Sequence, residues 1–134
     1  RNEAFWKDAL SNITTKKNYT PIHLALKDNA VDTFYIILKN INDELWWKNI
    51  LSTYDTDGYT PIHHIDYESS YLIPKILLSV IKNETFWNDI LSIKPNNANV
   101  KFINGIPKIL GMPNNYPELI EMTRNIDLNK YISM

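Results

Sequence analysis

The sequence Tyr-Thr-Pro-Ile-His at residues 19–23 occurs a second time, unchanged, at residues 59–63, so the two copies lie 40 residues apart. A second phrase has two aromatic, two polar and two apolar residues, and it occurs at residues 5–10, 46–51 and 86–91 with nearly the same spacing. Self-similarity with a period of roughly 20 to 50 residues is typical of stacked supersecondary units, which cannot bury their apolar faces alone. The spacing therefore predicts a repeat protein whose function lies on a surface built by stacking.

The repeated motif predicts where helices begin. Thr20 and Thr60 are good N-cap residues, and the proline after each suits the first helical position, where an amide hydrogen is not needed. The histidine of the motif can link its ring nitrogens to the cap and to a neighbouring backbone group. Gly58 stands just before the second copy in an Asp-Gly pair that favours a tight turn, and Asn18, which tolerates the same conformation, takes its place in the first copy.

Thr-Pro-Ile-His resembles the Thr-Pro-Leu-His signature of ankyrin repeats, and residues 20–26 follow that family's continuation through the small residue Ala25. The resemblance implies an all-α fold, an ankyrin-like helical solenoid that binds other proteins without catalysis. Ankyrin repeats have about 33 residues, so the longer period implies enlarged, three-helix repeats. The recurring aromatic phrase then belongs to the third helix of each unit.

Apolar periodicity and capping residues give the expected helices. The tryptophans recur at helical positions, which indicates core packing rather than a stacking platform for bases. Asn42 or Asp43 can cap the third helix of the first unit. The expected helices cover residues 3–12, 20–27 and 31–41, the phrase at 46–51, residues 60–67, the stretch from Ser69 or Ser70 to Ile81, the phrase at 86–91, and residues 117–125 and 128–132, with a loop at 94–99.

We expect a single ankyrin-repeat domain over residues 1–134. Its parts are an N-terminal capping helix (1–13), a first repeat (14–53), a second repeat (54–93), and a degenerate repeat with a C-terminal cap (94–134). A degenerate terminal repeat is what a solenoid needs as a cap. The first residues carry the phrase that elsewhere closes a repeat, so we read the chain as a piece of a longer protein.

Composition excludes several classes of function. The 134 residues are 44% apolar with a net charge of −1, which supports a core but provides no overall field to attract nucleic acid. No apolar run is long enough to span a membrane. The chain has no cysteine, so it has no disulfide and no thiolate metal site, and we expect an intracellular, reducing compartment.

The histidines and acidic residues are the candidates for chemistry. His23 and His63 occupy the motif position, where a structural hydrogen-bonding role is favoured. His64 and Glu68 are four residues apart and His63 and Asp66 three apart, the spacing of metal ligands on one helical face. Two ligands per face are too few for a closed site, so we expect no metal and no cofactor.

Two further patterns argue against an enzyme. Asp55 and Asp57 form a carboxylate pair, but their place before Gly58 favours a role in a turn. The sequence contains neither a glycine-rich phosphate loop nor a Gly-x-Ser-x-Gly nucleophile motif. The third hypothesis is an unrecognised enzyme or metal protein centred on His63, His64, Asp66 and Glu68.

The resemblance to ankyrin repeats also implies where a protein partner would bind, namely on the hairpin tips and the exposed edge of each first helix. The two tyrosines of the motif could instead pack on the next hairpin, and the two readings are equally favoured. The implied partner-binding residues are Lys16, Lys17, Tyr19, Lys27, Asp28, Thr56, Asp57, Tyr59, Tyr67 and Glu68.

The leading hypothesis is therefore a non-catalytic protein-interaction module. Its composition and irregular repeats look similar to those of ankyrin effectors of intracellular bacteria or large viruses, which would bind a host protein in the host cytoplasm. The alternative is a structural or intramolecular docking platform for an enzymatic domain elsewhere in the parent chain. Exposed repeat ends would also allow self-association.

Overall fold

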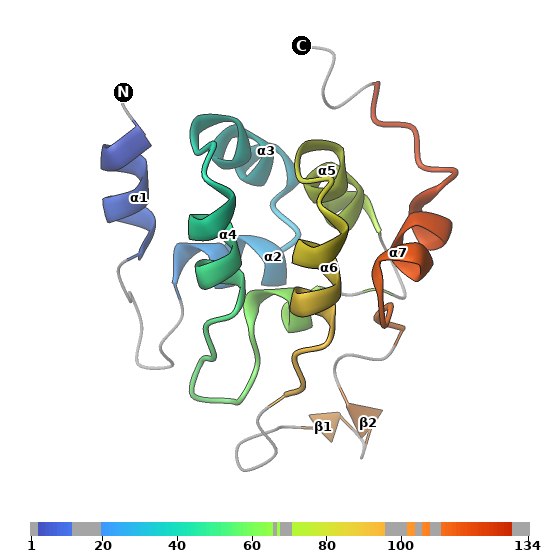
Figure 1. Ribbon diagram of the computed structural model, residues 1–134. Coiled ribbons are helices and arrows are strands. Elements are labelled where there is room, and N and C mark those ends of the chain that lie inside the picture. The colour runs from blue at the N-terminus through green and yellow to red at the C-terminus, as the bar shows by residue number, and fades with distance from the viewer. Residues whose placement is uncertain are drawn as a thin grey trace.

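The computed structural model describes residues 3–11, 20–65, 67, 71–95, 102–103, 106–107 and 111–129, and this part of the chain is helical apart from one pair of very short strands (Figure 1). None of the described helices is long and apolar enough to cross a lipid bilayer. The elements are α1 (Glu3–Ser11), α2 (Pro21–Lys27), α3 (Val31–Asn40), α4 (Glu44–Leu51), the 3₁₀ helix η1 (Pro61–His64), α5 (Leu72–Val80), α6 (Glu84–Leu91), β1 (Phe102–Ile103), β2 (Ile106–Pro107) and α7 (Tyr116–Thr123).

The helices form two matched sets that follow the sequence repeat. α2, α3 and α4 are followed by η1, α5 and α6, and each helix of the first set contacts its counterpart in the second. Figure 1 shows α3 beside α5 and α4 beside α6, with α1 at one end of the row and α7 at the other. α7 contacts α5 and α6, while α1 contacts α2 and α3. Repeated sequence therefore places helices of the same kind next to one another.

The third helix of each set begins at a side-chain cap. Asp43 Oδ1 accepts a hydrogen bond of 3.1 Å from the Trp46 amide at the start of α4, and Asn83 Oδ1 accepts one of 3.2 Å from the Phe86 amide at the start of α6. Each cap satisfies an amide that has no partner within its helix. α4 and α6 are thus regular elements in equivalent positions, as the aromatic phrase predicts.

One tryptophan of each third helix is buried and hydrogen-bonded. Trp47 and Trp87 lie in the core, and the indole Nε1 of each donates to the carbonyl six residues before it, that of Ile41 at 2.9 Å and that of Ile81 at 2.6 Å. The preceding residues differ between the units, since Trp46 is half-buried whereas Phe86 is buried. The prediction that these tryptophans form core is confirmed for Trp47 and Trp87.

The first helix of the second set is shorter than expected. The sequence pattern predicts a helix over residues 60–67, but η1 ends at His64 and Ile65 is extended, with φ −69° and ψ 134°. The Ile62 carbonyl accepts from the Ile65 amide at 3.3 Å and from the Tyr67 hydroxyl at 2.9 Å. These local bonds replace an α-helical turn and let Ile65 and Tyr67 both enter the core. The next helix, α5, accordingly begins at Leu72 rather than at Ser69 or Ser70.

The C-terminal part keeps the expected helix with shifted ends. α7 begins at Tyr116, where Asn115 Oδ1 accepts from the Glu118 amide at 2.9 Å, and it ends at Thr123. The antiparallel pair of β1 and β2 was not predicted. Most of the helix expected over 128–132 and of the loop expected over 94–99 lies outside the described residues.

Candidate functional site

The motif histidine of the first unit is buried in a hydrogen-bond network. The Thr20 amide donates to His23 Nδ1 at 3.1 Å, and His23 Nε2 lies 2.9 Å from the Thr53 carbonyl. A backbone amide can only donate, so Nδ1 must be an acceptor. The ring is therefore neutral, with its hydrogen on Nε2, and it donates to Thr53.

His63 repeats this arrangement in the second unit. The Thr60 amide donates to His63 Nδ1 at 3.0 Å, and His63 Nε2 lies 3.0 Å from the Ile93 carbonyl. Burial lowers the pKa of His63 and also that of His23, and the carbonyl bonded to each ring offsets only part of this effect. Each histidine thus ties the first helix of a unit to the residues just after its third helix, and the ring is occupied by this structural role.

Asp55 and His64 form a second buried contact near the motif. His64 Nε2 lies 2.6 Å from Asp55 Oδ2, and both side chains are fully removed from solvent. The other oxygen of Asp55 accepts from the Asp57 amide at 2.8 Å and from the Tyr59 amide at 3.1 Å, around a turn in which Gly58 has a φ of 87°. An Asp–His pair is a familiar part of catalytic sites. This pair is closed to a substrate, and it holds the loop between α4 and η1 in place.

The proposed metal pairs gain no support from the described residues. Asp66 and Glu68 lie outside them, while His63 uses both ring nitrogens and His64 uses Nε2 for the contacts above. Among the described residues, no group of three or more His, Asp or Glu side chains is placed to hold a metal ion. Within the same ranges, every buried side-chain nitrogen or oxygen has a hydrogen-bond partner. The polar side chains that are buried in the described part of the chain therefore stabilise the fold.

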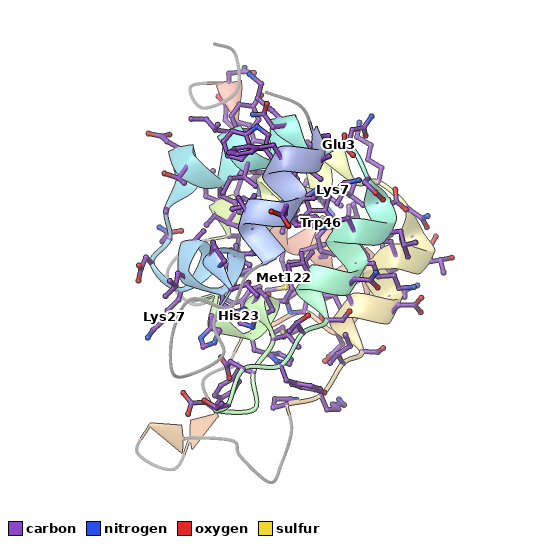
Figure 2. The ribbon with its side chains drawn as sticks, turned by 90° about the vertical axis from the view of Figure 1, so that its left-hand side faces the viewer. Glu3, Lys7, His23, Lys27, Trp46 and Met122 are labelled. Carbon is purple, nitrogen blue, oxygen red and sulfur yellow. The ribbon has the colours of Figure 1, made fainter. Side chains whose placement is uncertain are left out.

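Some of the residues expected to contact a partner are on the surface. Lys27 and Asp28 are exposed at the C-terminal end of α2, and Figure 2 shows Lys27 pointing away from the helix. Thr56 is exposed in the loop between α4 and η1, and Asp57 beside it is half-buried. These four residues form two separate surface patches, which we call the α2 end (Lys27 and Asp28) and the loop tip (Thr56 and Asp57).

Two of the predicted tyrosines, Tyr59 and Tyr67, are buried. Tyr59 is 1% exposed and Tyr67 is 2% exposed, so the prediction that they contact a partner is wrong. The Tyr59 ring centroid lies 6.0 Å from that of His63 and 5.6 Å from that of His64, so Tyr59 packs inward against the two histidines that follow it. The next hairpin, on which the alternative placed this ring, lies mostly outside the described residues. Burial also raises the pKa of the Tyr67 hydroxyl above its usual range. The remaining predicted residues, Lys16, Lys17, Tyr19 and Glu68, lie outside the described part of the chain.

The described residues also line two hollows that were not predicted as sites, although Asp28 of the larger one is a predicted partner-binding residue. A groove of about 200 Å³ between α4 and α6 includes Leu45, which is 67% exposed. A larger one, of about 410 Å³, lies between α1, α2 and α3, and we call it the α1–α3 groove. It is lined by Trp6, Leu10, Pro21, Leu24, Ala25, Asp28, Ala30, Thr33, Ile36 and Ile37. The sequence indicated this region only through the expectation that the ends of the repeat stack would be exposed.

Neither family models nor curated proteins match the sequence, and no solved structure matches the fold. Function is therefore inferred from the geometry of this chain.

Proposed function

We propose that this chain is a non-catalytic protein-interaction module of ankyrin type, built as a helical solenoid of three-helix units. One observation carries the proposal. The two motif histidines, 40 residues apart, make the same pair of hydrogen bonds, from the Thr amide of their own motif and to a carbonyl 30 residues later. A motif used identically in successive units is typical of a stacked repeat scaffold.

The burial of the histidines supports the absence of catalysis. General acid–base groups must come within hydrogen-bond reach of a substrate. His23, His63 and His64 are all buried, and each is hydrogen-bonded to the scaffold. The three histidines, which are the side chains best suited to acid–base catalysis at neutral pH, thus hold helices and loops together. Binding of a partner then falls to the polar surface.

The exposed residues of the α2 end and the loop tip support protein binding at these two patches. The stacked units of solenoid proteins create extended surfaces to which partners bind. Lys27 and Thr56 are exposed, so they can be changed without disturbing the buried network. We place the contact with the partner at one or both patches.

Affinity capture with the full chain as bait tests this assignment. Lys27→Glu and Thr56→Arg should each be compared with wild type, after circular dichroism has shown that each variant is folded. Lys82→Glu is a matched control, because Lys82 is exposed between α5 and α6 and belongs to neither patch. We expect at least one patch variant to weaken capture about tenfold or more, as for an interface hot spot. A partner retained equally by both patch variants would remove these patches from the proposal.

A further inference from the structure

The α1–α3 groove lies at the end of the helix row that α1 occupies (Figure 1). Its walls include the apolar side chains of Trp6, Leu10, Leu24 and Ile36. Single exposed apolar residues are ordinary on a protein surface, but a contiguous apolar hollow marks a place where something packs. A comparison of the two repeat units indicates which kind of element packs into the groove.

Residues of the first unit that line the groove are more exposed than the equivalent residues of the second unit. Ile36 on α3 is 53% exposed, whereas Ile76, 40 residues later on α5, is 0% exposed. Thr33 is likewise exposed, and its counterpart Ile73 is buried. Figure 1 shows α1 and α5 on opposite sides of α3, so the groove side of α3 corresponds to the side of α5 that faces α3. The second unit is covered at these positions because the first unit lies on it.

α1 occupies the position of a third helix. It carries the same aromatic phrase as α4 and α6. The Asn42 amide donates to Glu3 Oε1 at 3.0 Å, and Asn83 Nδ2 donates to the equivalent Glu44 Oε1 at 2.8 Å. Lys7 adds an ion pair of 2.6 Å with Asp43, and Figure 2 shows Glu3 and Lys7 on the side of α1 that faces α4. In both cases the first glutamate of one helix therefore accepts a hydrogen bond from a residue at the start of the next helix that carries the phrase.

We propose that the α1–α3 groove is a docking surface for one helix pair with the chemistry of residues 20–40. The pair lies on α2 and α3 as these lie on η1 and α5. No described element occupies that position. The ring of His23 packs against that of His64, with centroids 5.9 Å apart, and the counterpart of His64 is Leu24 in the groove. The histidine of the docked pair that corresponds to His23 therefore packs against Leu24, an apolar side chain, where His23 packs against His64.

This inference rests on the solenoid part of the proposed function, not on partner capture. Variants in the groove test stacking, whereas variants at Lys27 and Thr56, which do not line the groove, test partner binding. Either result can fail while the other stands.

The test is an extended chain in which a second copy of residues 20–43 is placed directly before Glu3. Asp43 of the copy then precedes α1 as Asp43 precedes Glu44 in the natural chain. We expect one cooperative thermal transition, with a midpoint at least about 5 °C above that of the natural chain, because the copy covers apolar surface. Limited proteolysis should also leave the copy intact. An unchanged midpoint, or a copy that is removed selectively by protease, would overturn the proposal.

Two matched substitutions localise the effect. Ile36→Lys should abolish the rise in midpoint in the extended chain but have little effect in the natural chain, where Ile36 is about half exposed. Val80→Lys is the control, because Val80 is 47% exposed on α5 and does not line the groove. It should leave the rise intact. Sedimentation of the natural chain as a dimer that Ile36→Lys dissociates would show that a second copy covers the groove, and would also overturn the proposal.

If the extended chain does not fold, binding of a peptide of residues 20–43 to the natural chain tests whether the groove accepts the helix pair. The peptide has no tryptophan, whereas Trp6 lines the groove of the full chain. Titration should give a saturable blue shift of tryptophan emission that is absent in the Trp6→Phe and Ile36→Lys variants. No shift at peptide concentrations up to about 1 mM, an affinity limit near −4 kcal/mol, would contradict the proposal.

Discussion

Lowering the pH from about 7.5 to about 5 should destabilise the protein through His23 and His63. Burial lowers the pKa of each ring below the ordinary value of 6.5. Below pH 6.5 the unfolded chain therefore binds more protons than the folded chain, and the free energy of unfolding falls as the pH falls. Each ring contributes a slope of at most about 1.4 kcal/mol per pH unit, so the two together contribute at most about 2.7 kcal/mol per unit. From about one pH unit above 6.5 both rings are almost entirely neutral in either state and add almost no slope.

The bonding pattern gives the physical reason for this sign. A proton on Nδ1 of His23 would point at the Thr20 amide hydrogen, which now donates to that nitrogen. His63 and Thr60 are arranged in the same way. Protonation therefore removes a buried hydrogen bond and places a charge in the core, and both changes are unfavourable.

Urea unfolding followed by circular dichroism at a series of pH values measures this slope. His23→Gln and His63→Gln each remove one titrating ring, so each variant should lose about half of the slope, and the double variant should lose most of it. The comparison uses slopes because each substitution also lowers stability at every pH. A free energy of unfolding that is constant or rises toward pH 5, or a slope that survives in the double variant, would refute the reasoning.

Five further substitutions test the packing by equilibrium unfolding at neutral pH. Ile76→Ala should cost about 2 to 5 kcal/mol, and the equivalent Ile36→Ala less than about 1 kcal/mol, because only Ile76 is covered; equal costs would contradict the matched stacking. Gly58→Ala should cost about 1 to 2 kcal/mol because Gly58 has a φ of 87°, and a neutral effect would show that the turn can rearrange. Trp47→Phe and Trp87→Phe should each cost about 1 to 3 kcal/mol, since each leaves a buried carbonyl without its indole donor; a loss in one unit only would show that the units are not equivalent.

Sequence reasoning was most successful where the structural signal is local. Thr20 before Pro21 and Asp43 before the aromatic phrase mark helix starts because a capping side chain and its amide are only three residues apart. The turn at Gly58 follows from the same kind of short-range chemistry. The period of 40 then indicated that these local elements recur as equivalent units.

Features that depend on tertiary contacts could not be predicted in this way. Asp55 and His64 belong to different elements, so helical spacing suggested Glu68 as the neighbour of His64 and missed the buried pair. The inward packing of Tyr59 follows from that same loop, since Asp55 holds the Tyr59 amide. η1 is short because the Tyr67 hydroxyl returns to the Ile62 carbonyl, a contact that no periodicity reveals. The α1–α3 groove required a comparison of burial between units.

The ring nitrogens of the motif histidines provide the most direct test of the central claim, that the repeated motif is a structural link between helices rather than a site for chemistry. Long-range ¹H–¹⁵N correlation spectra at neutral pH report the tautomer and the proton exchange of each ring. We predict that His23 and His63 both appear as neutral Nε2–H tautomers with slowly exchanging ring protons, since each donates to a carbonyl 30 residues away. Rapidly exchanging rings that titrate with an ordinary pKa near 6.5 would contradict the account.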